Sequence, residues 1–253
     1  NSPQLEDIVI SGGDSLLLRP GQIRQIGITL LNIPTVRRIR FATKGVAIMP
    51  MKFTSDTEWM DALTEVCELG QARMKEVALH THFNTEREIT AWTASAMKSL
   101  SATGVRVRNQ SVLIHGVNDS LDHMRRTTKK LSSLLIQPYY LYLHDMVPSC
   151  EHLRTTVRVA ENLSQRIQGS TAGFNTPRVV CDAPGGGGKR DISSYTLYDE
   201  EIGVSAWTSP TAKPGEMFFY YDPIHQLPDQ GQTLWANEAE ITKRLAKFKA
   251  EAT

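Results

Sequence analysis

The sequence predicts an α/β fold: an incomplete parallel (β/α) barrel of about six strands, followed by a C-terminal extension and helix. Three observations predict it. Apolar strand-like runs alternate with segments of helical periodicity. The runs begin about 30 to 40 residues apart, which is the size of one βα unit. Polar clusters follow most of the runs, where a parallel barrel builds its ligand site.

Six runs have the composition of buried strands, rich in branched and aromatic residues. They are residues 6–10, 36–43, 76–83, 105–114, 138–145 and 178–182. Their regular spacing leaves room for one helical crossover between each pair, so we expect parallel strands joined by right-handed connections.

Capping and stop signals define the first helices. Pro20 suits the first turn of a helix that reaches Leu31. Ser55 or Asp56 can cap a second helix, which we expect to end near residue 69 with Gly70 as its stop. Apolar residues at helical spacing predict three further helices, over 89–104, 121–135 and 153–167.

The chain is expected to have two parts. Residues 1–189 carry the βα rhythm and would form the larger part of a barrel. Residues 190–253 lose the rhythm and form a C-terminal extension, with short strands near 203–207 and 217–221 and a charged helix over 237–251.

Composition excludes several classes of protein. The chain has 253 residues, 28 of them basic and 27 acidic, and its net charge of +1 argues against a nucleic-acid or membrane-surface partner. No apolar run reaches the roughly 20 residues that cross a bilayer, and no signal peptide opens the sequence. The three cysteines form no CxxC pair, which favours a reducing, cytoplasmic location.

Polar residues gather where the predicted strands end. The clusters are Ser11 to Asp14, His80 to Asn84, Asn109 to Ser111, His144 with Asp145, and Asp182. Helix caps occupy the same loops, so one cluster alone would be weak evidence. Five of six strands deliver such a cluster, which indicates a ligand-binding barrel face.

The most distinctive motif runs from Asp182 through four glycines to Lys189. Glycines let the backbone turn freely and approach a ligand closely. The motif is not a Walker A loop, because Ala183 replaces the first glycine and Arg190 the Ser/Thr. A flexible surface loop is one interpretation; the other is a Schiff-base lysine at Lys189, whose amine burial would keep neutral.

Asp145 and Asp182 close consecutive strands and could face one pocket. Two carboxylates without further metal ligands suit a cationic substrate group, and helix capping is the alternative. His80 and His82 share a face of one strand, but no third metal ligand lies nearby, so we expect no metal site and a hydrogen-bonding role for His82. Tyr142 could reach the same pocket.

These residues resemble a known family, the lysine 2,3-aminomutases among the radical S-adenosylmethionine enzymes. The matching segments, in family order, are SGGD (11–14), THFN (81–84), NQSVLIHGVND (109–119), QPYYLYLHD (137–145), EHLRTTV (151–157) and DAPGGGGK (182–189). They cover almost the whole chain up to Lys189, and the last segment is the most diagnostic.

The resemblance implies an isomerase with an incomplete TIM-type barrel that uses pyridoxal phosphate, S-adenosylmethionine and a 4Fe-4S iron-sulfur cluster. It implies that Lys189 holds pyridoxal phosphate through its amine, that Tyr142 lines that site, and that Asp145 and Asp182 bind the distal amino group of lysine. The residues implied to contact S-adenosylmethionine are Ser11, Gly12, Gly13, Asp14, His82 and Gln110.

Two features depart from the family pattern. The CxxxCxxC cluster motif and the arginine after it, which binds the substrate carboxylate, lie upstream of SGGD in the family. The chain lacks both and begins at Asn1 without Met, so we expect it to be a piece of a longer protein, inactive alone, with the cluster ligands outside it. Ser120 stands in place of a family cysteine, and no cysteine follows Lys189, which argues against the family's zinc site.

The sequence therefore predicts a 2,3-aminomutase that moves the α-amino group of L-lysine to the β carbon by a radical mechanism. Its partner would be a small amino acid substrate, and a homo-oligomer stays open. The alternatives are the same chemistry on another amino acid, a non-catalytic relative without a cluster, or a Schiff-base aldolase on a closed barrel.

Overall fold

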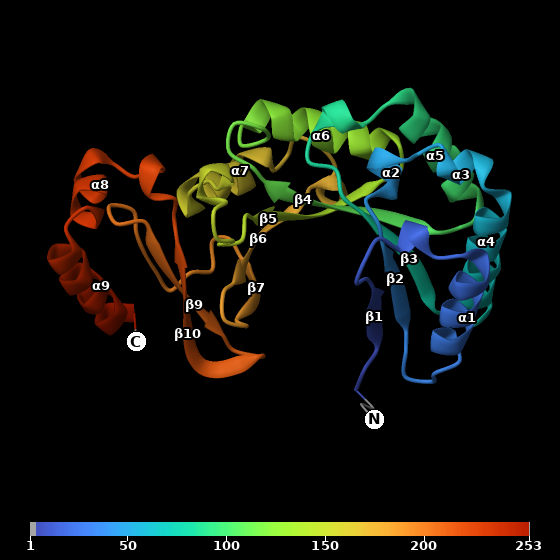
Figure 1. Cartoon of the computed structure of the whole chain (residues 1–253), viewed down its shortest axis with the longest axis horizontal. Helices are drawn as coiled ribbons and strands as arrows, with labels where there is room; N and C mark the ends of the chain where they lie inside the picture. The colour runs from blue at the N-terminus through green and yellow to red at the C-terminus, as the bar shows by residue number, and fades with distance from the viewer. Residues whose placement is uncertain (1–3, 253) are drawn as a thin grey trace. The chain divides into compact units, whose positions relative to one another are not determined.

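The computed structural model describes residues 4–252 and shows an α/β protein with two sheets (Figure 1). Seven strands form one sheet in the order β1-β2-β3-β4-β5-β6-β7, and three form another in the order β10-β9-β8. Because β1 and β7 are its edge strands, the large sheet is open. Strands in chain order, separated by helices, confirm the α/β class and the incomplete parallel barrel.

The chain divides into two compact units. The first unit contains the residues up to Gln110 together with Arg126–Tyr139, and the second contains Ser111–Arg125 together with the residues from Tyr140 onward. The domain boundary expected after residue 189 stays a prediction.

Parallel strands form the sheet of the first unit. They are β1 (Asp7–Ile10), β2 (Arg38–Ala42), β3 (Glu76–Thr81) and the first part of β4 (Arg106–Leu113). The helices are α1 (Pro20–Leu31), α2 (Gly45–Ile48), α3 (Lys52–Ser55), α4 (Thr57–Ala72), α5 (Ala91–Ala102) and α6 (Leu121–Ser133), whose first turn belongs to the second unit, with 3-10 turns at Ser15–Leu17 and Glu86–Glu88. Helices α1 and α4 pack side by side (Figure 1).

The expected start of α4 is confirmed and its expected end is wrong. Asp56 accepts a hydrogen bond from the Trp59 N–H at 3.0 Å and so caps the helix. Gly70 lies inside the helix. A Cβ there would come within 2.8 Å of the Val77 side chain on β3, so the glycine serves close packing and not the end of the helix. The helix ends at Ala72 with Arg73 as its C-cap, and Met74, the next residue, adopts a left-handed φ of 54°.

Helix α6 ends in the same way. The N–H of Ile136 donates to the carbonyl of Leu131 at 3.1 Å, and Leu135 adopts a φ of 59° between them. This is a Schellman motif with leucine in the position that usually holds glycine. Leu135, the last residue of the helix expected over 121–135, lies just beyond the helix and is 73% exposed.

The second unit combines a short part of the large sheet with the C-terminal extension. Its strands are β5 (Gln137–Leu143), β6 (Arg178–Ala183), β7 (Gly188–Asp191), β8 (Leu197–Asp199), β9 (Val204–Ser209) and β10 (Lys213–Tyr221), of which β5 begins in the first unit. Its helices are α7 (Val157–Ile167), α8 (Asp229–Trp235) and α9 (Glu238–Ala252), with 3-10 turns at Glu151–Leu153, Gly173–Asn175 and Ile224–Gln226.

The extension is more ordered than its sequence suggests. Strands β9 and β10 lie at the expected positions, and β8 pairs antiparallel with β9 although no strand was expected there. Strand β7 was also not expected; it turns back from the glycine run and pairs antiparallel with β6. Helix α7 begins at Val157 rather than near residue 153, because Thr156 caps it by accepting from the Val159 N–H.

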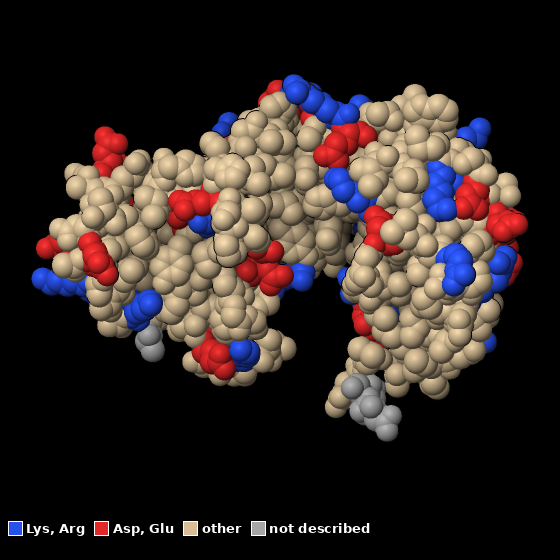
Figure 2. All heavy atoms as spheres, viewed as in Figure 1, with Lys and Arg blue, Asp and Glu red and all other residues tan. Residues whose placement is uncertain are grey.

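Charged side chains of both signs are interspersed on the face drawn in Figure 2. This agrees with the net charge of +1 and gives no single-sign patch on that face. Among the residues that the structure describes, no helix is long and apolar enough to cross a membrane.

Candidate active site

Lys189 and Asp182 face each other across the β6–β7 hairpin. They are paired residues of the antiparallel ladder, and the Lys189 Nζ lies 3.4 Å from the Asp182 Oδ2. Their side chains are 44% and 40% exposed, so Lys189 is not the buried amine expected from the sequence. The hairpin is possible because Gly185 and Gly186, in its turn, adopt φ angles of 82° and 92°.

Tyr142 and Asp145 complete this group from the end of β5. The Lys189 Nζ lies 5.6 Å from the centre of the Tyr142 ring, within cation–π range. Burial, and then the negative charge of Asp182, raise the pKa of Asp145 above its usual value. Asp145 does not close the strand as expected; it follows β5 by two residues.

The cluster of Tyr142, Asp145, Asp182 and Lys189 thus holds two carboxylates and one ammonium. Burial is the larger cause of the raised Asp145 pKa, and the negative charge of Asp182 adds to it, while Lys189 opposes both. If the Lys189 amine loses its charge, both carboxylates lack a cation. The arrangement therefore suits a ligand that brings an ammonium group of its own.

The C-terminal extension holds the glycine turn in place. The Lys213 Nζ donates to the Gly185 carbonyl at 3.0 Å. A Cβ on Gly187 would lie 2.7 Å from both the Ala183 Cβ and the Phe218 Cγ, so only glycine fits there. The sequence pattern gave no signal for Lys213 and Phe218, because they lie on a strand 25 or more residues away along the chain.

The segment that carries Asp145 is held by the same extension. The Tyr220 hydroxyl donates to the His144 carbonyl at 2.8 Å. Arg154, which is buried, donates to the Tyr221 carbonyl at 2.6 Å. Strand β10 therefore fixes the chain on both sides of the 146–153 loop.

Asp222, just after β10, is a further buried anchor. It accepts hydrogen bonds from the Val157 N–H at 2.8 Å and the Tyr198 hydroxyl at 2.6 Å. Burial raises the pKa of Asp222 to about 7 in spite of these bonds. It thereby ties the start of α7 to the small sheet.

The first unit holds the second group of predicted residues, beginning with the loop after β1. Both carboxylate oxygens of Asp14 accept backbone hydrogen bonds at 2.9 Å, from Leu16 and from Lys44. Asp14 therefore shapes the loop. Ser11, Gly12 and Gly13 are exposed and line a cavity of about 280 Å³.

The structure brings His82 and Gln110 together. The His82 ring is hydrogen-bonded to the backbone of Gln110; burial, and then the charge of Lys44, lower the pKa of His82. The Lys44 Nζ donates to the His82 carbonyl at 3.0 Å and to Glu88 at 3.3 Å. Lys44 thus links the His82 segment to Asp14.

Sequence reasoning missed Lys44 and the role of Asn109. Lys44 follows β2, the one predicted strand without a polar cluster. Asn109 is 1% exposed and binds both the N–H and the carbonyl of Phe83, at 2.6 and 3.0 Å. Through these two bonds the Asn109 side chain pairs with the backbone of the loop after β3, in the way that the backbone of a neighbouring strand would. No group of three His, Cys, Asp or Glu suited to a metal occurs between residues 4 and 252.

Searching protein-family models gave no match. Curated proteins are clearly similar. The L-lysine 2,3-aminomutase of Clostridium subterminale is 35% identical over 192 residues, which is 76% of this chain and 44% of that protein. The Bacillus subtilis enzyme of the same name is 35% identical over 230 residues, covering 90% of this chain and 46% of its own. The glutamate 2,3-aminomutase of Clostridioides difficile is 30% identical over 189 residues, covering 75% and 42%.

Among solved structures, a radical SAM methyltransferase from Sphaerobacter thermophilus is 18% identical, with a TM-score of 0.39, over 66% of this chain and 59% of its own. A likeness at that level carries no conclusion about function.

The fold is that of an α/β protein with two groups of polar residues at the carboxyl ends of its strands, which is where parallel α/β proteins commonly bind small ligands. From its similarity to the curated relatives, the chain belongs to the lysine 2,3-aminomutase family. It spans less than half the length of those relatives.

Proposed function

We propose that this chain is the part of a lysine 2,3-aminomutase that binds the substrate and pyridoxal phosphate, and that the whole protein moves the α-amino group of L-lysine to the β carbon. The observation that carries the proposal is the group formed by Asp145, Asp182 and Lys189. This group has one amine, which can hold the cofactor, and two neighbouring carboxylates, which can bind a cationic group of the substrate. The names of the curated relatives support a 2,3-aminomutase.

The residues of the second unit fit pyridoxal phosphate. Lys189 presents an accessible amine just after the glycine turn, and the Tyr142 ring lies beside that amine. When bound, pyridoxal phosphate would delocalise the unpaired electron of the substrate radical while the amino group migrates, and S-adenosylmethionine with a 4Fe-4S cluster would remove and return the hydrogen. The cluster ligands would lie outside this chain.

The carboxylates select the substrate in this proposal. With the Lys189 amine engaged by the cofactor, Asp145 and Asp182 keep no cation of their own, and the distal ammonium of lysine supplies one. Each charge-assisted hydrogen bond contributes about 1.5–3 kcal/mol. A glutamate side chain would place a third carboxylate there, so glutamate is disfavoured.

The other group would bind S-adenosylmethionine. Ser11, Gly12 and Gly13 offer an exposed, glycine-rich backbone at the end of β1, with Asp14 fixing the loop. His82 and Gln110 lie against each other at the ends of β3 and β4. Backbone groups of this kind can bind the amino-acid end of the cofactor.

The test is the substitution Asp182→Asn in the full-length protein with its cluster reconstituted. We expect turnover of lysine to fall more than tenfold, because the substrate cation loses one partner, at about 2–5 kcal/mol. Attachment of pyridoxal phosphate to Lys189 should persist. Asp191→Asn, on the same hairpin but paired with Arg178, is the matched control and should retain activity.

Two results would contradict the proposal. If Asp182→Asn lowers the melting temperature and leaves lysine turnover intact, Asp182 serves the fold and not the substrate. If the wild-type protein prefers glutamate to lysine, the carboxylate pair is not the recognition element.

A further inference from the structure

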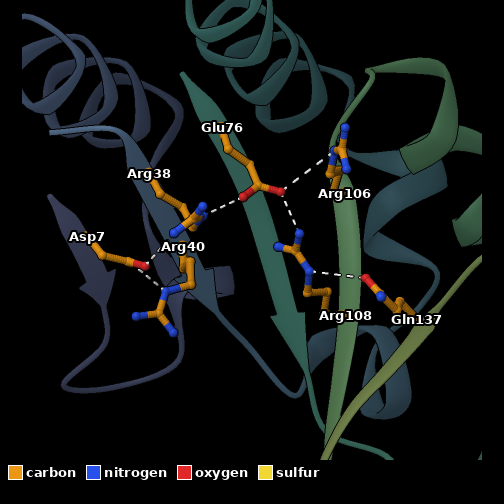
Figure 3. A network of polar contacts seen from close by, with 7 residues as sticks. All are labelled: Asp7, Arg38, Arg40, Glu76, Arg106, Arg108 and Gln137. Carbon is orange, nitrogen blue, oxygen red and sulfur yellow. Dashed lines mark hydrogen bonds and ion pairs between the residues drawn. The ribbon is translucent and has the colours of Figure 1, made fainter. Parts of the chain in front are cut away.

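A layer of charged side chains covers one face of the sheet in the first unit, at the amino ends of the strands (Figure 3). This is the end opposite to the one that carries Asp14, His82 and Gln110. The layer contains Asp7 of β1, Arg38 and Arg40 of β2, Glu76 of β3, Arg106 and Arg108 of β4, and Gln137 of β5. Alternate residues of a strand share a face, which places Arg38 with Arg40 and Arg106 with Arg108 on one side.

The two carboxylates of the layer are fully engaged. Asp7 contacts Arg40 at 2.7 Å and Arg38 at 3.1 Å. Glu76 contacts Arg38 at 2.5 Å and Arg108 at 2.6 Å, with Arg106 at 3.6 Å. Burial alone would raise the pKa of Glu76, but the bonds from Arg38 and Arg108 hold it below its usual value. Glu76 is thus ionised at neutral pH.

The charges of the layer do not balance. The layer has four arginines and two carboxylates, but Arg106 is 73% exposed and so is well screened by water. The other three arginines still exceed the two carboxylates by one positive charge. Arg108 is only 16% exposed and Arg40 only 23%, so water screens these charges incompletely. Within the described residues, the single recorded ion-pair partner of Arg40 is Asp7.

His80 gives a second, independent sign of a ligand. It is 7% exposed, and its Nε2 has no hydrogen-bond partner within the described structure. It pairs in register with Arg108 of the neighbouring strand. Burial, and then the charges of Arg40 and Arg108, lower the pKa of His80 to about 4, so the ring is neutral at pH 7 and able to donate a hydrogen bond.

These groups surround one cavity of about 170 Å³, lined by Asp7, Arg38, Arg40, Glu76, His80, Arg108 and Tyr139. Pockets for drug-sized ligands measure roughly 300–1,000 Å³, so this cavity suits a much smaller group. An excess of positive charge excludes a metal cation. A buried polar nitrogen without a partner is unfavourable unless something fills the space beside it.

We propose that this cavity binds a small oxyanion of the size and double charge of phosphate, held by Arg40, Arg108 and His80. Guanidinium groups bind such oxygens with two parallel hydrogen bonds. The anion offsets the excess positive charge of the arginines and accepts the hydrogen bond that His80 Nε2 lacks. His80 and Arg108 lie two residues before His82 and Gln110 on β3 and β4, but neither His82 nor Gln110 lines this cavity, and the proposal does not depend on the proposed function.

The test titrates inorganic phosphate at pH 8 into the full chain, with sodium chloride adjusted to hold the ionic strength constant. We expect a saturable rise in melting temperature at millimolar phosphate and a matching heat of binding by calorimetry. The imidazole pKa of His80, followed by NMR, should rise by at least one unit, because the anion reverses the local potential. Acetate, a monoanion, should have at most a tenth of this affinity.

Variants separate a site from a general salt effect. Arg40→Gln and His80→Phe should each weaken phosphate binding at least tenfold. The matched control Arg24→Gln removes an arginine that pairs with Glu65 on the helices, far from the layer, and should bind phosphate normally. Lys189→Ala should also leave phosphate binding unchanged, which separates this site from the cofactor group.

The proposal is overturned if phosphate raises the melting temperature no more than chloride does, or if Arg40→Gln and His80→Phe bind phosphate as tightly as the wild type. Binding of acetate with equal affinity would overturn the assignment to a dianion. If Arg40→Gln does not fold, His80→Phe decides the question alone, since it preserves the ion pairs.

Discussion

At the scale of single residues, Lys189 and Asp182 illustrate how one short motif acquires its chemistry. The glycine run allows the chain to reverse, and the reversal turns a separation of seven residues into a direct cross-strand pair. Asp145 then joins from another strand and senses the Asp182 charge. Without a ligand, the Lys189 amine therefore has the Asp182 carboxylate as its ion-pair partner.

We expect Lys189→Ala to abolish covalent attachment of pyridoxal phosphate, because the Lys189 amine is exposed and lies 5.6 Å from the centre of the Tyr142 ring. The measurement is borohydride reduction of the protein with the cofactor, followed by peptide mass spectrometry. Lys213→Ala is the control: it removes the contact to Gly185 but leaves the attachment. Labelled peptide from Lys213 in the wild type would refute the assignment.

Asp222 gives a prediction about pH. Its pKa is raised from the ordinary 3.8 to about 7, so the folded state holds a proton that the unfolded state releases. The stability contributed by this proton is present at low pH and is lost as pH rises from about 4 through about 7. The unfolding free energy of the wild type should therefore fall relative to Asp222→Asn over that range, by at most ~1.4 kcal/mol per pH unit.

Urea unfolding of both proteins at several pH values measures this difference. Asp229→Asn, at an exposed position in α8, is the control and should run parallel to the wild type. A difference between wild type and Asp222→Asn that does not change with pH would show that Asp222 is ionised throughout.

At the scale of elements, the helix ends show where local sequence rules give way. Helices α4 and α6 are both followed by a left-handed residue that is not glycine, Met74 and Leu135. Gly70, which resembles a stop signal, is required for close packing against Val77. A glycine near a helix end can therefore either end the helix or allow close packing against a neighbouring element. For Gly70, the position of Val77 on β3 shows that packing is the reason.

Replacing Met74 by glycine should stabilise the protein. Met74 is 91% exposed and has a φ of 54°, so its side chain contributes little packing while the backbone is strained. We expect Met74→Gly to raise the unfolding free energy by about 0.5–1 kcal/mol. Thermal and denaturant unfolding measure it, and Met74→Ala should give no such gain. A loss of stability in Met74→Gly would mean that the methionine side chain packs in solution.

At the scale of the whole molecule, the three cysteines bear on the iron–sulfur cluster. Cys67 and Cys181 are buried, and burial raises the pKa of the Cys67 thiol to about 12 and that of Cys181 as well. Cluster iron binds thiolates, and burial disfavours the loss of the proton that would turn these two thiols into thiolates. Cys67 and Cys181 also belong to different compact units.

The 253-residue chain alone should therefore hold no cluster after anaerobic reconstitution with iron and sulfide. Iron and sulfide analysis, with the visible absorption spectrum, is the measurement. The full-length protein under the same conditions is the control and should bind one. Stoichiometric iron and sulfide on the 253-residue chain would contradict the expectation that the ligands lie elsewhere.

Much of this architecture follows from the sequence alone. Apolar alternation and regular spacing predicted all six parallel strands to within about two residues at most ends, because strand formation depends on neighbours two positions apart. The motif from Asp182 to Lys189 directed attention to the residues that the structure pairs. The roles assigned to the cofactor-binding residues stay predictions.

Only the tertiary structure shows which distant residues hold the predicted site residues in place. Lys44 meets Asp14 and His82 across 30 and 38 positions of sequence, and Tyr220 meets His144 across 76. The charged layer of Arg40, Arg108 and Glu76 exists only because the parallel strands β2, β3 and β4 lie side by side in this register. Local periodicity reports which face a side chain takes, but the partner that it meets depends on how distant strands are brought into register.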